Sequence, residues 1–271
     1  MNTLPAQVID LSVTLSEQLP CAWPGHAPYV HKNSSWFTEI GLATGETCRS
    51  LGPYQTNFMI LDEHCGTHVD GPSHFIPPAG SGLPWAGPLG EVSGDRLDLA
   101  RLIGSAAVVD VRSLGGHTSL GFSPPITRSH LESWEGDHGP FRAGDVALLW
   151  TDWSRFYAAG PKGRRYVHGP LVTKSSPGWP ALDPEAAIFL CERGVVTVGT
   201  DAPSMGAAQG GAPVHREGLS RGMLFIELLT NLGRLPPRGA LFIFLPLKIA
   251  ASTGGPGRAI ALLGQTDPPP S

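Results

Sequence analysis

Three histidines and one aspartate lie within the eleven residues from His64 to His74. The segment reads His-Cys-Gly-Thr-His-Val-Asp-Gly-Pro-Ser-His. Imidazole and carboxylate groups together are ligands that suit zinc, manganese or iron. Because so dense a set of ligands is hard to explain without a metal, we expect a divalent ion and metal-assisted chemistry on a small molecule.

The local backbone decides which of these side chains meet. His64 and His68 are four residues apart, but Gly66 and the β-branched residues around it disfavour a helix. In a strand or bulged strand, alternate side chains point to one face, so His64, His68 and Asp70 converge. Two histidines and one carboxylate leave coordination positions open for a water, which a hydrolytic metal needs.

His74 lies just beyond Pro72, where the chain can turn back toward the same ion. Two roles are open to it at this point. It is either a further metal ligand or an unligated imidazole, and an unligated imidazole beside a metal-bound water is well suited to carry a proton because its usual pKa lies near neutrality.

The pattern His-x-Gly-Thr-His-x-Asp-x-Pro-x-His resembles the signature of the metal-dependent cyclase family, which includes bacterial kynurenine formamidases and isatin hydrolases. The resemblance extends over nearly the whole chain. Further segments that match the family are Asp10-Leu11-Ser12, Trp23-Pro24-Gly25, Gly144-Asp145, Gly199-Thr200-Asp201-Ala202-Pro203-Ser204, and His215 followed twelve residues later by Glu227.

This resemblance implies a metal centre completed from the second half of the chain. It implies that His64, His68 and Asp70 hold one ion, zinc or manganese, and that Asp70 bridges to a second ion held by His215 and Glu227. Isatin hydrolases carry Gln where this chain has Glu227, and the added negative charge favours two ions. The alternative is a single ion with Glu227 acting as a base beside it.

The resemblance also implies the activity. We expect hydrolysis of the C–N bond of an amide or lactam, such as an aryl formamide or an isatin-like cyclic amide, with His74 moving the proton to the leaving nitrogen. Trp23 and Phe75 are candidate walls for an aromatic or cyclic substrate, although single aromatic residues are as often plain packing residues.

Two other readings of the same residues lead to different functions. A metal-dependent cyclase or dehydratase acting on a polyketide-type intermediate would use the ion to stabilise an enolate. A metal-binding module without turnover is the third reading, and the open coordination positions argue against it, because structural zinc sites are closed by four protein ligands.

The elements that must position these residues follow an α/β pattern. Asp183 as N-cap and Pro184 at the first helical position predict a helix that ends near Gly194. A second helix is predicted over residues 219–232. Short apolar or alternating runs predict strands at residues 8–15, 106–111, 145–150, 195–199 and 240–247.

These elements fit one α/β domain over residues 1–271, since no repeat or linker divides the chain. By resemblance we expect a mixed or barrel-like β-sheet core with flanking helices, of the swivelling β/β/α type. The long Pro- and Gly-rich loop at residues 76–94 is a candidate lid, and residues 265–271 are expected to be frayed.

Composition limits the partners and the location. The formal net charge is −4 with no basic cluster beyond residues 162–165, so we expect no nucleic-acid partner. No apolar run is long enough to cross a membrane, and four scattered cysteines with no recognisable leader favour a cytoplasmic enzyme. Similar proteins imply a homodimer or homotetramer.

Overall fold

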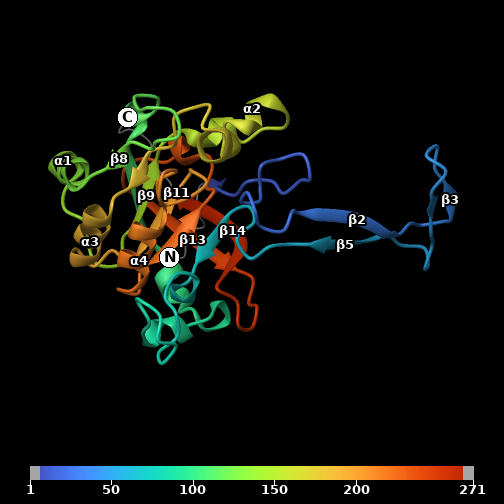
Figure 1. Ribbon diagram of the computed structural model, residues 1–271, viewed down its shortest axis with the longest axis horizontal. Coiled ribbons are helices and arrows are strands. Elements are labelled where there is room, and N and C mark those ends of the chain that lie inside the picture. Colours follow the sequence, from blue (N-terminus) through green and yellow to red (C-terminus); the bar gives the residue numbers. More distant parts are fainter. Residues whose placement is uncertain (1–6, 265–271) are drawn as a thin grey trace, which may run out of the picture.

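The computed structural model describes residues 7–264, and its centre is a β-sheet that closes on itself (Figure 1). The predicted tail at 265–271 lies outside the described residues. The strands run in the order β1-β14-β13-β7-β9-β11-β12-β6, and a further pairing of β14 with β6 completes a ring of which β1 alone is not a member. Their bounds are β1 (Gln7–Asp10), β6 (His68–Asp70), β7 (Ile103–Asp110), β9 (Val146–Trp150), β11 (Thr197–Thr200), β12 (Leu224–Glu227), β13 (Ala240–Pro246) and β14 (Gly254–Leu263).

The four strands β7, β9, β11 and β12 are parallel, and the remaining pairings in the ring are antiparallel. Helices α1 (Arg128–His138), α3 (Pro184–Glu192) and α4 (Ala212–Leu219) cover one side of the parallel strands (Figure 1). The sequence of β9 is apolar throughout because both of its faces are buried. Ala147 and Leu149 face the cluster under the helices, while Val146 and Leu148 face the cluster inside the ring. The expected mixed α/β, barrel-like fold class is confirmed.

Helix α3 begins where the sequence predicts. The Asp183 side chain accepts a hydrogen bond from the Ala186 N–H at 2.7 Å, and Pro184 occupies the first turn, where its missing N–H costs nothing. Gly194 follows the helix with a φ of +80°, a left-handed conformation that glycine adopts without strain. The helix then leads into β11, which ends just before Asp201.

The predicted helix over residues 219–232 is wrong. Helix α4 ends at Leu219, where the prediction begins, and Leu224–Glu227 form the buried strand β12 between β11 and β6. A short run of consecutive apolar residues does not distinguish a buried strand from a buried helix. Pairing with a strand on each side determines the outcome here. The predicted strand over 8–15 is also shorter than expected and ends at Asp10.

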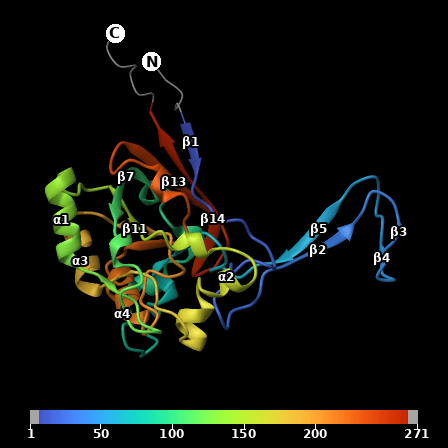
Figure 2. The same cartoon turned by 90° about the horizontal axis from the view of Figure 1, so that it is seen from above.

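A β-hairpin of residues 30–60, which we call the arm, projects away from the rest of the molecule (Figures 1 and 2). Its two long strands are antiparallel, and a second, smaller pair of strands lies at its tip. No pattern in the sequence predicted this hairpin. Its strands are β2 (Val30–Ser35), β3 (Ile40–Gly41), β4 (Thr47–Cys48) and β5 (Thr56–Ile60).

The remaining elements are short. They are β8 (Pro125–Ile126) paired with β10 (Ala181–Leu182), α2 (Pro161–Arg164), a π-helical turn (Gly169–Thr173), and 3-10 turns at Pro72–His74, Pro88–Glu91, Gly94–Arg96, Leu99–Leu102, Arg112–Leu114, Trp153–Phe156 and Leu232–Arg234. Within residues 7–264, none of the helices has the length and apolar character that crossing a membrane requires.

Candidate metal centre

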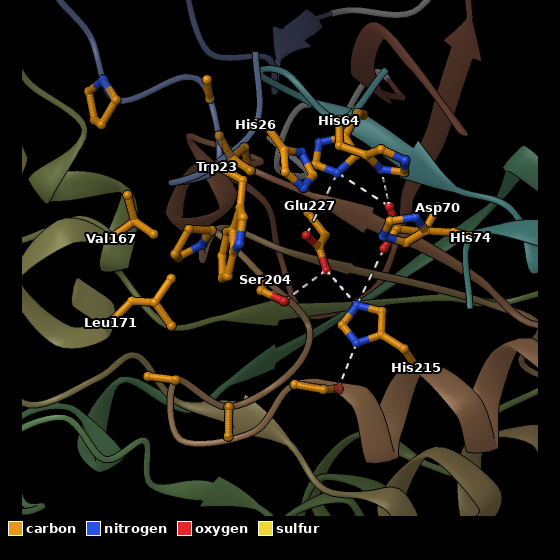
Figure 3. Close-up of a pocket in the computed structure, with 18 of the residues that line it drawn as sticks. Trp23, His26, His64, Asp70, His74, Val167, Leu171, Ser204, His215 and Glu227 are labelled. Atoms are coloured by element: carbon orange, nitrogen blue, oxygen red, sulfur yellow. Dashed lines mark hydrogen bonds and ion pairs between the residues drawn. The ribbon is translucent and has the colours of Figure 1, made fainter. Parts of the chain in front are cut away.

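The structure brings six of the predicted residues together beside strands β6 and β12 (Figure 3). Strand β6 carries two of them, and its antiparallel pairing with β12 sets Glu227 directly opposite His68. The others come from the turn before β6, the 3-10 turn after it, and α4. All six line the same cavity: His64, His68, Asp70, His74, His215 and Glu227.

Asp70 occupies the middle of this group and is 1% exposed. Its Oδ1 lies 2.8 Å from Nδ1 of His64 and 3.3 Å from Nε2 of His68. Its Oδ2 lies 3.3 Å from Nε2 of His215. Glu227 approaches the same imidazoles, with Oε1 3.2 Å from Nε2 of His215 and Oε2 3.7 Å from Nε2 of His68. Each carboxylate therefore faces two or more imidazole nitrogens.

Backbone carbonyls determine which imidazole nitrogens are free. Nδ1 of His68 lies 2.8 Å from the Gly66 carbonyl, and Nδ1 of His215 lies 2.8 Å from the Gly211 carbonyl. A carbonyl accepts only, so Nδ1 carries the proton and, in the neutral ring, Nε2 presents a lone pair. In the neutral rings these lone pairs point at the carboxylates. Two acceptors that face each other with no proton between them repel, so this arrangement needs a cation. The donor set therefore fits a divalent metal ion.

Two groups of three residues have ligand atoms within 4.8 Å of one another. One group is His64, Asp70 and His74, and the other is His68, Asp70 and Glu227. Asp70 belongs to both, which is the position a bridging carboxylate occupies. The His74 ring stacks on His64 with ring centroids 3.9 Å apart, so it lies within reach of the site whether it binds the ion or carries a proton.

Burial and neighbouring charge shift the pKa values of the centre in different directions. Burial alone would raise the pKa of Asp70. The surrounding imidazoles, His74 and His215 foremost, lower it by more than burial raises it, so the pKa of Asp70 lies well below its usual value. Burial opposes the charged form of His215, yet its hydrogen bonds to the two carboxylates raise its pKa to about 10, so a proton on Nε2 takes the place of the cation when no metal ion is bound. Burial also lowers the pKa of His74 to about 4, so this imidazole is neutral at pH 7.

The cavity above the centre has a volume of about 390 Å³ and mostly apolar walls. Both predicted wall residues line it. Trp23 packs edge-on against Trp179 with ring centroids 6.2 Å apart, and Phe75 stacks on His215 at 4.5 Å. The cavity lining includes no residue of the candidate lid at 76–94.

Several lining residues escaped the sequence analysis. Val167 and Leu171 form the wall opposite the histidines, and His26 lies at the side of the cavity (Figure 3). Ser204 donates a hydrogen bond to Oε1 of Glu227 at 3.3 Å. The only signal for Ser204 was its place in a segment shared with the family, and the two aliphatic residues carry no recognisable motif.

Comparison with known proteins gives results consistent with this geometry. The family model described as "Putative cyclase" matches residues 9–207. An isatin hydrolase from Roseibium aggregatum is 33% identical over 221 residues, which are 79% of this chain and 77% of that protein. A kynurenine formamidase from Erythrobacter litoralis is 27% identical over 255 residues, covering 94% of this chain and 93% of the relative.

Solved structures show the same similarity. An isatin hydrolase bound to the product analogue thioisatinate has a TM-score of 0.75 and 26% sequence identity, over 96% of this chain and 93% of that one. Isatin hydrolase A from Ralstonia solanacearum also has a TM-score of 0.75 at 26% identity, covering 95% of this chain and 92% of that chain.

Proposed function

Because the chain belongs to the cyclase family, we propose that its buried centre hydrolyses the C–N bond of a cyclic or aryl amide. The enzyme is a metal-dependent hydrolase of amide C–N bonds, and the proposal concerns its substrate. The relatives named isatin hydrolase and kynurenine formamidase support an isatin-like lactam or an aryl formamide. The mostly apolar cavity supports the same classes, because a flat ring can lie against Trp23 and Phe75.

We propose that the metal is zinc or manganese, with one or two ions per chain. His64, His68 and Asp70 would hold one ion, and Asp70, His215 and Glu227 would hold the second. A divalent ion held by these residues would lower the pKa of a bound water and polarise the substrate carbonyl. The observation that carries the proposal is the convergence of imidazole nitrogens on two buried carboxylates.

His74 is the proposed proton carrier. Its imidazole lies within reach of the other ligand atoms of the centre, where it can accept a proton from the attacking water and deliver it to the leaving nitrogen. The stacking against His64 holds it beside the centre, and Phe75 makes an edge-on contact with it, with ring centroids 4.7 Å apart.

The test uses protein loaded with zinc or manganese and offered isatin, N-formyl aromatic amines and simple lactones in ¹⁸O-labelled water. We expect turnover of an amide with one labelled oxygen in the product, because hydrolysis requires water. An unlabelled product would indicate ring closure or dehydration instead. A metal-loaded protein that turns over none of these compounds would support the reading as a binding module. Metal analysis of protein purified without chelator counts the ions.

We also propose that the protein is a homodimer in which each arm packs against the partner. The arm exposes apolar side chains along its length, including Phe58, Met59 and Ile60, each about half exposed. An isolated two-stranded hairpin is marginally stable in water, so it needs a surface to pack on.

The same chain offers such a surface on the outer face of β1, β14 and β13. Val8, Leu262 and Leu241 lie side by side across these strands, with Ile243 and Leu245 following along β13. Val8 is 56% exposed and Leu245 is 51% exposed. Two unpartnered apolar surfaces on one chain are both covered in a twofold dimer, which is a closed assembly. Sedimentation over a range of concentrations tests the proposal, and a monomer throughout would contradict it.

A cytoplasmic location is proposed as well. All four cysteines, at positions 21, 48, 65 and 191, are free thiols, as expected in a reducing compartment. Fractionation of the producing cells with a cytoplasmic marker enzyme checks this proposal.

A further inference from the structure

His64 differs from His68 and His215 in the group that binds the ring nitrogen pointing away from the carboxylates: a side-chain hydroxyl instead of a backbone carbonyl. Its Nδ1 lies 2.8 Å from Oδ1 of Asp70, and its Nε2 lies 2.9 Å from Oγ1 of Thr253. Thr253 immediately precedes β14, 189 positions along the chain. The pairing of β14 with β6 brings it here, because Gly254 lies directly opposite Asp70.

Thr253 has a single hydroxyl proton, and Glu63 accepts it. Oγ1–H of Thr253 donates to Oε2 of Glu63 at 2.9 Å, and the Thr253 N–H donates to the same oxygen at 2.7 Å. An ionised carboxylate accepts only, so the direction of this hydrogen bond is settled. The hydroxyl oxygen is then left to accept from His64, which requires the proton of the neutral ring to be on Nε2. The lone pair of Nδ1 consequently faces Asp70.

The ring of His64 also has little room to turn. A side chain at position 254 would come within 2.8 Å of Cε1 of His64, so only the bare backbone of Gly254 fits against that edge. The ring of His74 stacks on one face. The main-chain N–H of His64 is itself held by Oδ1 of Asp62 at 2.9 Å. Ring position and protonation site are therefore both specified.

We propose that Thr253 and Glu63 are positioning residues that fix the tautomer of His64 so that Nδ1 is free to bind the ion. The inference rests on the proposed metal function. His68 and His215 obtain the same result from backbone carbonyls, which substitution of a side chain cannot remove. His64 depends on two side chains, and its protonation site is therefore open to mutation.

The first measurement is metal affinity by competition with a chelator. Thr253→Val keeps the shape of the side chain and removes the hydroxyl, and we expect metal affinity to fall about 10- to 100-fold, the usual effect of losing such a partner. Thr253→Ser keeps the hydroxyl and is the matched control, so its affinity should stay close to that of the wild type. Equal affinities for Thr253→Val and wild type would overturn the proposal.

The second measurement is ¹⁵N NMR of the imidazoles in metal-free protein at alkaline pH. Wild type and Thr253→Ser should show the His64 proton on Nε2, and Thr253→Val a mixture of tautomers. Glu63→Met frees the hydroxyl to donate to His64, so it should shift the proton toward Nδ1; it also provides the test if Thr253→Val fails to fold. A wild-type His64 with its proton on Nδ1 would overturn the proposal. Wild-type protein that binds no metal would instead overturn the proposed function, and the NMR result would still decide the tautomer.

Discussion

The metal centre and the arm lie next to each other in the sequence and have opposite surfaces. The centre buries polar groups that usually stay in water, with Asp70 1% exposed and Glu227 5% exposed. The arm exposes apolar groups that usually leave it, with Met59 56% exposed and Leu51 70% exposed. Both patterns indicate a partner, because buried charges need a counter-charge and large exposed apolar surfaces usually mark a site of interaction.

The difference between the two regions indicates the kind of partner that suits each one. In the centre, protein groups hold the outer nitrogens of His64, His68 and His215 in place, so the partner that suits this region is a small cation. The arm pairs with itself and exposes side chains on both of its faces, since Phe58 and Met59 are successive residues of one strand. A surface exposed on both faces is suited to a large partner, such as a second copy of the chain.

Removing the shared carboxylate should have the largest effect on the centre and none on the arm. Asp70→Asn takes the charge from the atom group that faces three imidazoles, and we expect loss of bound metal and abolished turnover. Metal analysis and kcat/KM measure the effect. Asp10→Asn, an ion-paired carboxylate on the outside of β1, is the control. Retention of full metal content in Asp70→Asn would refute its place as the shared ligand.

His74 distinguishes a ligand from a proton carrier within the centre. As a carrier it should be needed for turnover alone, so His74→Ala should lower kcat by about 10²- to 10⁴-fold while the metal content stays unchanged. If metal is lost together with activity, His74 belongs among the ligands, as its grouping with His64 and Asp70 allows. Unchanged turnover across the pH range with metal bound would remove both roles.

The sequence predicted the centre far better than the arm, and the reason is locality. His64 to His74 are close along the chain, and alternation in a strand was enough to place His68 and Asp70 on one face. Glu227 and His215 came from resemblance only, since no spacing rule sets Glu227 opposite His68 across two strands. The partner of His64, Thr253, is 189 positions distant and carries no motif.

The arm was missed because its sequence does not look like a strand with a buried face. Strand β2 reads Val-His-Lys-Asn-Ser-Ser, without the alternation of apolar and polar residues on which the predictions rely. Strand β5 has apolar residues in succession, which indicates burial on both faces. In this chain both faces of β5 are exposed, because no other element packs against them. A rule that assumes a core within one chain therefore could not predict the arm.

A charged residue on the arm tests whether the arm forms the dimer interface. Met59→Lys places an ammonium group within the exposed apolar run, and we expect the dissociation constant of the dimer to rise at least about 100-fold, because an unpaired buried charge is costly. Sedimentation at several concentrations gives the constant. The metal content should not change. Leu120→Lys, a leucine that is 57% exposed outside the arm, is the matched control and should leave the dimer intact.

Asp201 shows what burial does to a carboxylate that has no imidazole beside it. Of the substitutions considered, a change at Asp201 should have the smallest effect. It is as deeply buried as Asp70, but its partners are the hydroxyls of Thr151 and Ser154 and the Thr151 N–H, with no imidazole. Burial outweighs these hydrogen bonds and raises the pKa of Asp201 to about 6, opposite in direction to Asp70.

The folded protein therefore binds a proton at Asp201 that the unfolded chain, with an ordinary pKa near 3.8, does not bind between about pH 4 and 6. The ionised form destabilises the fold above pH 6 by roughly 3 kcal/mol at most, and the penalty disappears as the pH falls toward 4. Asp201→Asn can keep the Thr151 hydrogen bonds and should be more stable than the wild type at pH 8 but not at pH 4. Urea unfolding at both values measures the difference. An equal difference at both pH values would mean that burial does not raise the pKa of Asp201.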